Sequence, residues 1–137
     1  MDDKPTIIRK SALAVIKDKK ILMTREEQNE FAFYMLGGTI EAGESEEDCL
    51  KREVIEEVGI PLISDSLKYL AEFENDAHGK VNTRVNIKLY YGDLDGEPIP
   101  SSEIVEIAYF DSTINPKHLT PISEEIFSWL KNRNYIS

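Results

Sequence analysis

Three glutamates, Glu53, Glu56 and Glu57, have a spacing that would place their carboxylates together. Residues at i, i+3 and i+4 lie on one face of an α-helix. Like charges on such a face repel one another by about a few tenths of a kcal/mol per exposed pair, and a cation would reverse that cost. Carboxylate oxygens suit Mg²⁺ or Mn²⁺, so the spacing predicts a divalent metal site. The alternative is an ordinary amphipathic helix with a solvated acidic face.

The surrounding residues carry the signals of a helix that begins at about Glu46. Ser45 is a suitable N-cap, with Asp48 three residues later. Gly59 can end the helix in the left-handed conformation, and Pro61 follows just beyond it. An apolar stripe beside the acidic face is formed by every fourth residue, namely Leu50, Val54 and Val58. We therefore expect one side of this helix to pack on a core and another to face a ligand.

The stretch from Gly38 to Ile60 resembles the signature motif of the Nudix hydrolases. Gly38 is followed after five residues by Glu44, and after seven more by the run 52–60, REVIEEVGI, so every defined position of the 23-residue motif is filled. The resemblance implies an α/β fold, a Nudix-type α/β/α sandwich with a mixed β-sheet between helices. It also implies an enzyme, a metal-dependent pyrophosphohydrolase that cleaves a nucleoside diphosphate linked to another group, X.

The same resemblance implies a role for individual residues of the motif. The implied metal ligands are the carbonyl of Gly37 and the carboxylates of Glu53, Glu56 and Glu57. The expected cofactor is Mg²⁺, with Mn²⁺ as the alternative. Arg52 and Glu44 resemble the family's supporting pair, in which the planar guanidinium orients carboxylates. Glu53 is the leading candidate for the group that takes a proton from the attacking water.

Residues outside the motif supply further candidates. Many family members use an additional carboxylate, and Glu103 is favoured here over Glu106. The histidines at 78 and 118 lie in turns, where we expect surface residues and no catalytic group. We expect Cys49 to be a small buried hydrophobe and not a nucleophile.

Four more side chains are candidates for binding the substrate. Arg25 lies in the charged segment 25–30, which we otherwise expect to be a solvated loop. Arg84 and Lys88 lie on the polar face of the alternating segment 81–92, which could instead be solvated. Tyr34 could stack on a base, although core packing is the alternative for it and for its aromatic neighbours.

The remaining elements follow from hydrophobic periodicity. We expect a strand over 6–17 that forms a hairpin with a strand starting at Ile21, and an apolar strand over 31–36 that leads into two glycines. Further strands are expected over 67–74, 81–92 and 104–110. A final helix should start at Thr120 and Pro121, with an apolar face formed by Ile122, Ile126, Trp129 and Leu130.

Length and composition limit the class of protein. The 137 residues fit a single domain, 1–137, and no apolar run is long enough to span a membrane. The N-terminus has no secretory signal and there is one cysteine, so a cytoplasmic protein is expected. The net charge of −10 disfavours nonspecific nucleic acid binding and repels anionic substrates, so metal ions must help to recruit them. A homodimer is possible, and the sequence does not decide the oligomeric state.

We infer the substrate by excluding subfamilies of the Nudix hydrolases whose characteristic residues are absent from this chain. Some ADP-ribose hydrolases of the family carry a proline about 15 residues after the motif, and some dinucleoside polyphosphate hydrolases a tyrosine at about 16 to 18. Residues 75–78 provide neither. We therefore expect a small nucleotide or diphosphate substrate, first of all a nucleoside triphosphate cleaved to monophosphate and pyrophosphate. A nucleotide-sugar or other diphosphate-conjugate hydrolase, or a non-catalytic nucleotide sensor, is the alternative.

Overall fold

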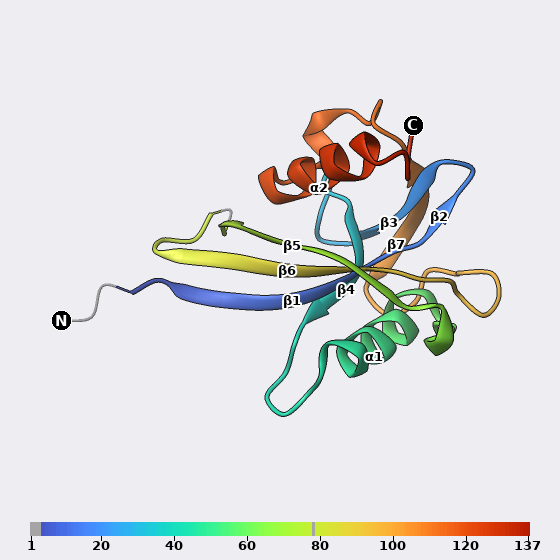
Figure 1. Ribbon diagram of the computed structural model, residues 1–137, viewed down its shortest axis with the longest axis horizontal. Helices are drawn as coiled ribbons and strands as arrows, with labels where there is room; N and C mark the ends of the chain where they lie inside the picture. The colour runs from blue at the N-terminus through green and yellow to red at the C-terminus, as the bar shows by residue number, and fades with distance from the viewer. Residues whose placement is uncertain (1–3, 78) are drawn as a thin grey trace.

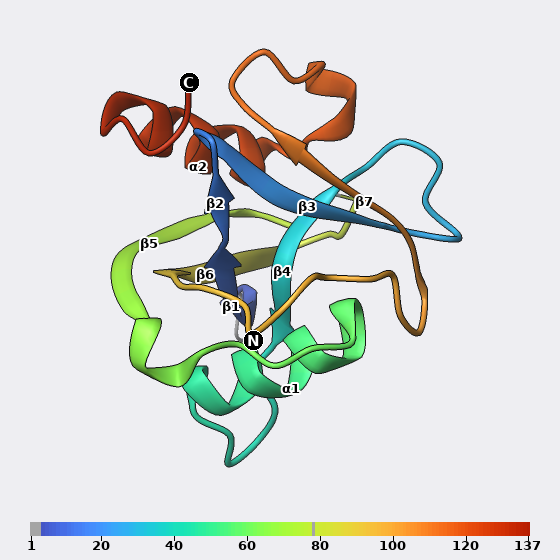
Figure 2. The same cartoon turned by 90° about the vertical axis from the view of Figure 1, so that its right-hand side faces the viewer.

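The computed structural model describes residues 4–77 and 79–137. Within them, seven strands form a mixed sheet in the order β2-β3-β4-β1-β6-β5, with β7 paired to β3. The strands are β1 (Thr6–Ala14), β2 (Ile16–Lys17), β3 (Lys20–Glu26), β4 (Tyr34–Thr39), β5 (Lys68–Asp76), β6 (Thr83–Tyr91) and β7 (Ile104–Phe110). The helices are α1 (Glu46–Val58) and α2 (Pro121–Asn132), with short 3-10 turns η1 (Ser64–Ser66) and η2 (Pro116–His118). The two helices lie on opposite sides of the sheet in Figures 1 and 2, which confirms the predicted α/β/α sandwich.

Strand β1 runs through the middle of the sheet. It pairs in parallel with β6 along its whole length and antiparallel with β4 over its second half. Residues 11–14, at the end of the strand, are buried on both faces. Ala12 and Ala14 pack under α2, while Leu13 packs under α1. The strand therefore belongs to both cores of the molecule.

Helix α1 has the ends that its sequence predicted. The Ser45 hydroxyl accepts a hydrogen bond from the backbone N–H of Asp48 at 3.0 Å, and Gly59 ends the helix with φ 73°. The apolar stripe is fully buried and consists of Leu50, Val54 and Val58. Cys49 is also buried, as expected, and its thiol donates to the carbonyl of Gly38 at 3.4 Å.

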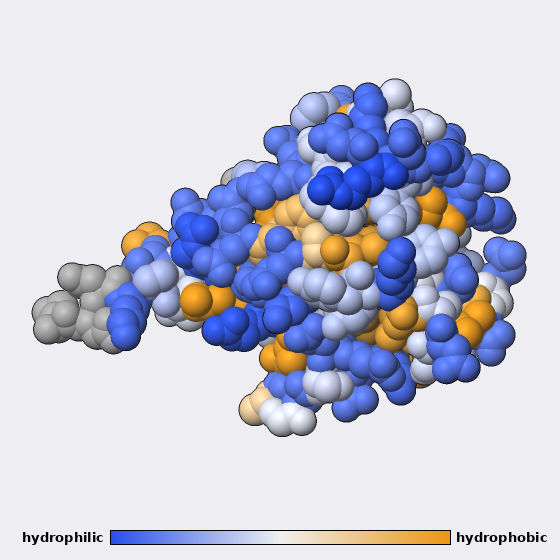
Figure 3. All heavy atoms as spheres, in the orientation of Figure 1, coloured by the Kyte–Doolittle hydropathy of each residue, from blue (hydrophilic) through white to orange (hydrophobic). Residues whose placement is uncertain are grey.

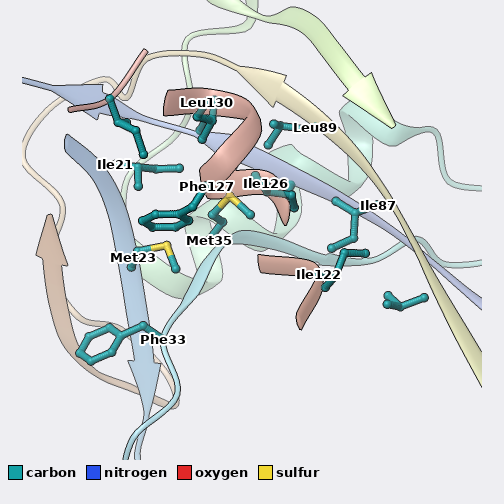
Figure 4. Packing of buried hydrophobic residues seen from close by; sticks show 14 residues of the cluster. Ile21, Met23, Phe33, Met35, Ile87, Leu89, Ile122, Ile126, Phe127 and Leu130 are labelled. Atoms are coloured by element: carbon teal, nitrogen blue, oxygen red, sulfur yellow. The ribbon is translucent and has the colours of Figure 1, made fainter. Parts of the chain in front are cut away.

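Helix α2 covers the opposite face of the sheet. Thr120 caps it and Pro121 is its first residue, as predicted. Its buried face includes Ile126 and Leu130, which belong to the same hydrophobic cluster as Met23 of β3 and Met35 of β4 (Figure 4). Trp129 is half-buried and packs edge-on against Phe73, so it is part of the core, as expected.

Several element boundaries differ from the prediction. Strand β3 continues through Arg25 and Glu26, which we expected in a loop, because β7 supplies hydrogen-bonding partners there. Strand β4 likewise continues through both glycines to Thr39 because β1 pairs with them. Strand β6 starts only at Thr83, which leaves Val81 94% exposed. Pairing between strands, which is decided in three dimensions, sets these limits.

The molecular surface is mostly hydrophilic in the view of Figure 3. Apolar residues lie in scattered places near the middle of that face. In residues 4–77 and 79–137, neither helix has the length and apolar content that a membrane span requires.

Candidate active site

Two glycines of β4 bring its backbone against the acidic face of α1. Gly37 has φ 128°, and a Cβ there would lie 2.1 Å from the carbonyl oxygen of Ser11. A Cβ on Gly38 would lie 2.6 Å from the carboxyl carbon of Glu53. The Gly37 N–H donates a hydrogen bond to Glu57 Oε1 at 2.9 Å. The missing side chain of Gly38 therefore lets the Glu53 carboxylate approach β4, whereas that of Gly37 lets β4 pack against the backbone of β1.

Arg52 connects the loop before α1 to the carboxylates on the helix. Its Nε donates to Glu44 Oε2 at 2.8 Å and its Nη2 to Glu44 Oε1 at 3.0 Å, a bidentate pair. Its Nη1 donates to Glu53 Oε1 at 2.6 Å, and Nη2 also donates to the carbonyl of Thr39 at 3.2 Å. The Arg52 hydrogen bond, followed by the backbone N–H of Glu41, lowers the pKa of Glu44 to about 2. The pair implied by the family resemblance is thus present, and its catalytic role stays a prediction.

The electrostatics of Glu57 favour the neutral acid when no cation is bound. Burial raises the pKa of Glu57 to about 8, with smaller contributions from the charges of Glu53, Glu26 and Glu56. The Gly37 hydrogen bond opposes this shift without cancelling it. Burial also raises the pKa of Glu53, against the opposing effect of Arg52. A bound cation would reverse both shifts, because it favours the ionised form of each carboxylate.

The third implied ligand, Glu56, stands apart from the other two. Its side chain is 55% exposed and lies 3.7 Å from the guanidinium of Arg52. Among the described residues, no three acidic, histidine or cysteine side chains are placed to hold a metal ion as they stand. We expected the three carboxylates to lie together, and the structure instead places Glu53 and Glu57 in one cavity and Glu56 outside it. Glu53 and Glu57 line one cavity beside the glycines. Their carboxylate oxygens are the type of ligand that a hard divalent cation prefers.

That cavity has a volume of about 340 Å³, which is the size of a small-molecule site. It is lined by the two carboxylates, both glycines and Tyr34, so it joins a predicted substrate residue to the predicted metal residues. The Tyr34 side chain is at the surface, and its hydroxyl accepts a hydrogen bond from the Asn29 amide at 3.4 Å. The ring is therefore available to a ligand in the cavity.

Two cavity residues were missed by the sequence interpretation. Glu26 lines the cavity together with Thr24, because residues two apart in β3 point to the same face of the sheet. Nothing within the charged run 25–30 distinguishes Glu26 from its acidic neighbours. Lys10 also lines the cavity, and the alternation of β1 could have indicated it, since Lys10 shares a face with Ala12.

The three predicted cationic partners of the substrate are already paired with carboxylates. Arg25 Nε lies 2.8 Å from Glu106, and Lys88 Nζ lies 3.6 Å from Glu46. Arg84 bridges two carboxylates, those of Glu74 at 3.0 Å and Asp76 at 2.8 Å. None of the three lines the cavity beside α1. Their binding of substrate stays a prediction.

The other candidates outside the motif lie around the end of β7. Glu103 is exposed and lines no part of the cavity, although its carbonyl accepts the N–H of Glu27 at 3.0 Å. His118 is half-buried, its Nδ1 lies 2.6 Å from the carbonyl of Phe31, and its ring meets Phe33 edge-on. His78 lies outside the described residues.

Comparison with known proteins supports the family that the motif resembles. Residues 8–130 match the model of the NUDIX domain family. The ADP-ribose pyrophosphatase of Methanocaldococcus jannaschii is 32% identical over 104 residues, which cover 74% of this chain and 60% of that protein. The NAD-capped RNA hydrolase NudC of Vibrio parahaemolyticus is 25% identical over 126 residues, covering 81% and 48%. The chain thus spans about half to three-fifths of the length of these relatives.

The fold is also similar to that of solved structures. The crystal structure of the MutT protein from Methanosarcina mazei Go1 has a TM-score of 0.77 at 17% identity, covering 96% of this chain and 97% of that chain. At that identity the likeness concerns the fold. Because the family model matches residues 8–130 of its 137 residues, this chain belongs to the Nudix family.

Proposed function

We propose that this protein is a metal-dependent pyrophosphohydrolase that cleaves the phosphoanhydride of a nucleoside diphosphate linked to X. One observation carries the proposal: Glu53 and Glu57 line the same cavity, Glu53 against Gly38 and Glu57 against Gly37 of β4. Burial raises the pKa of both carboxylates there, and a bound cation would offset this cost by favouring their ionised forms, which supports the proposal. Family membership agrees with this chemistry.

The chain's own residues then divide the work. When bound, Mg²⁺ or Mn²⁺ would neutralise phosphate oxygens, orient the substrate and acidify water. Glu53, Glu57 and, after rotation, Glu56 would hold the cation together with the carbonyl of Gly37. Arg52 keeps Glu53 in position through the 2.6 Å hydrogen bond, and Glu44 keeps Arg52 in position. We assign to Glu53 the role of general base, which accepts a proton from the attacking water.

Two residues outside the motif are candidates for the additional carboxylate that binds metal or accepts a proton. Glu103 was favoured by the sequence, whereas Glu26 lies in the cavity with Glu53 and Glu57. A proton acceptor or metal ligand must reach the reacting atoms, and a position in the cavity supports Glu26. Glu26→Gln and Glu103→Gln, compared for kcat at saturating substrate, separate the two assignments. The variant that loses about a hundredfold or more identifies the carboxylate that takes part.

For the substrate, we retain a nucleoside triphosphate, cleaved to monophosphate and pyrophosphate, as the first candidate. The cavity beside Tyr34 supports a small nucleotide. ADP-ribose is a second candidate because a 32% identical relative is an ADP-ribose pyrophosphatase. Nucleotide sugars form a third class, since they share the diphosphate and differ only in X.

The test is a substrate panel with Mg²⁺ or Mn²⁺ that contains nucleoside triphosphates, ADP-ribose and nucleotide sugars. Release of phosphate, pyrophosphate and monophosphate is measured for the unmodified protein and for Glu57→Gln. We expect hydrolysis of one class, a loss of several orders of magnitude in the variant, and unchanged circular dichroism. An unmodified protein that binds nucleotides but turns over none of them would instead be a sensor.

A further inference from the structure

The cavity beside α1 is rich in carboxylates and contains one cation. Among the described residues that line it, the acidic ones are Glu26, Glu53 and Glu57, and the only lysine or arginine is Lys10. The protein as a whole carries a net charge of −10. A diphosphate entering this cavity is repelled by every charge there except the metal and Lys10.

Lys10 lies at the junction of two compartments. It is half-buried in β1, paired to Thr39 of β4 on one side and to Ile87 of β6 on the other. The cavity beside α1 shares Lys10, Tyr34, Ile87 and Ser123 with a second cavity of about 270 Å³ near the start of α2. A ligand that extends from the carboxylates of α1 into the second compartment must therefore pass Lys10.

Lys10 also differs from the other basic candidates in having no partner among the residues that the structure describes. Within residues 4–77 and 79–137, its ammonium forms no ion pair or hydrogen bond with another residue. Arg25, Arg84 and Lys88 each have a carboxylate within reach, as described above. An anion that binds those three must displace a carboxylate first, whereas Lys10 loses only water. Lys10 is a half-buried residue, and solvent screens charges at partly buried positions less than charges at fully exposed ones.

We propose that Lys10 binds the phosphate of the substrate's diphosphate that faces away from α1, where the metal ligands do not reach. This inference rests on the proposed function for the identity of the ligand. Lys10 acts as a point charge with three N–H donors, which suits a phosphate of variable orientation. It would contribute equally to ground-state and transition-state binding, so its effect belongs to KM more than to kcat.

The first test compares Lys10→Gln with Lys17→Gln and Lys10→Arg. Lys17 is an exposed residue of β2 that lines neither compartment, so Lys17→Gln makes the same change in net charge elsewhere. With the best substrate of the panel and Mg²⁺, we expect Lys10→Gln to raise KM by about tenfold to a hundredfold, with kcat within about threefold. Lys17→Gln should change KM by less than about twofold, and Lys10→Arg should restore most of the loss.

The second test measures binding without turnover. Methylenediphosphonate with Mg²⁺ carries two phosphonates but neither base nor X, and calorimetry gives its affinity for the same variants. Weaker binding to Lys10→Gln by about tenfold or more, with Lys17→Gln unchanged, supports the assignment even if no panel substrate is hydrolysed. Equal affinity of Lys10→Gln and the unmodified protein, or no binding to either, overturns it. Hydrolysis with an unchanged KM in Lys10→Gln would overturn this inference and leave the proposed function standing.

Discussion

At the scale of single residues, the site depends on carboxylates held where water solvates them poorly. Glu57 is the clearest case, because burial and three neighbouring carboxylates all oppose its ionisation. Within the part of the chain that the structure describes, the hydrogen bond from the Gly37 N–H is the one contact that opposes this shift. A group in this situation stabilises the fold when protonated and binds a cation when ionised.

The first prediction concerns the pH dependence of stability without metal. Folding raises the pKa of Glu57 from 4.5 to about 8, so its contribution to stability is complete below pH 4.5 and is lost as the pH rises through 8. In the presence of a chelator, the free energy of unfolding should therefore fall over this range. Glu57→Gln should show a flatter profile and be the more stable protein at high pH. Urea unfolding of both proteins measures this, and parallel profiles would contradict it.

The second prediction contrasts the two glycines. A Cβ at Gly38 would meet only the flexible carboxylate of Glu53, whereas a Cβ at Gly37 would meet the backbone of Ser11. Gly38→Ala should therefore displace Glu53 and lower kcat/KM by about a hundredfold with little change in thermal unfolding. Gly37→Ala should lower the stability by about 1–3 kcal/mol or more, because its φ is also unfavourable for alanine. Thermal unfolding and kinetics of both variants test this, and an unstable but fully active Gly38→Ala would reverse our assignment.

At the scale of elements, the important contact is between the loop 40–45 and α1. Helix α1 is capped by Ser45 and fixed on the sheet by its buried stripe, so its acidic face has a set direction. The loop is attached to that helix by the bidentate pair of Arg52 and Glu44. The same guanidinium reaches Glu53, so the loop and the site are coupled through one side chain.

The third prediction is that Arg52→Lys impairs catalysis while keeping the charge. An ammonium cannot bind both oxygens of Glu44 and also reach Glu53 in the geometry of a planar fork. We expect kcat to fall by about tenfold to a hundredfold, measured with the best panel substrate, while thermal unfolding shifts little. Activity equal to that of the unmodified protein would show that charge alone suffices.

The fourth prediction uses the lowered pKa of Glu44. Since its pKa falls from 4.5 to about 2 in the folded protein, the pair stabilises the fold above pH 4.5 and loses this effect as the pH falls towards 2. The stability difference between the unmodified protein and Glu44→Gln should accordingly shrink between neutral and acid pH. Urea unfolding at several pH values measures it, and a difference independent of pH would refute the ion pair.

At the scale of the whole molecule, the sheet separates two apolar cores. One lies under α1 and the other under α2, and residues of both cores line the cavity of the site. Ile126 is fully buried in the α2 core, on the side away from the acidic helix. The two faces share the strands, so folding of the site requires both cores.

The fifth prediction follows from that separation. Ile126→Ala should lower the free energy of unfolding by about 2–5 kcal/mol, because it leaves a cavity in a packed core. The folded fraction should keep its kcat within about twofold, since Ile126 lines neither compartment. Denaturant unfolding and kinetics well below the melting temperature test both statements. A loss of kcat at full folding would show that the α2 core also positions the site.

Local sequence determined the ends of α1, its buried stripe and its acidic face, because caps and periodicity act over a few neighbouring residues. It also determined the family motif, and with it the pairing of Arg52 with Glu44. The limits of β3 and β4 were predicted less well, because strand ends depend on partners distant in the sequence, such as β7 for Arg25.

Only the tertiary structure decided which charged side chains meet in the cavity. It brought Lys10 and Glu26, from two different strands, to the carboxylates of α1, and it paired Arg25, Arg84 and Lys88 with acidic neighbours. The physical reason is that ion pairs and shared cavities join residues tens of positions apart. No local pattern of charges records which of them will be neutralised and which will face a ligand.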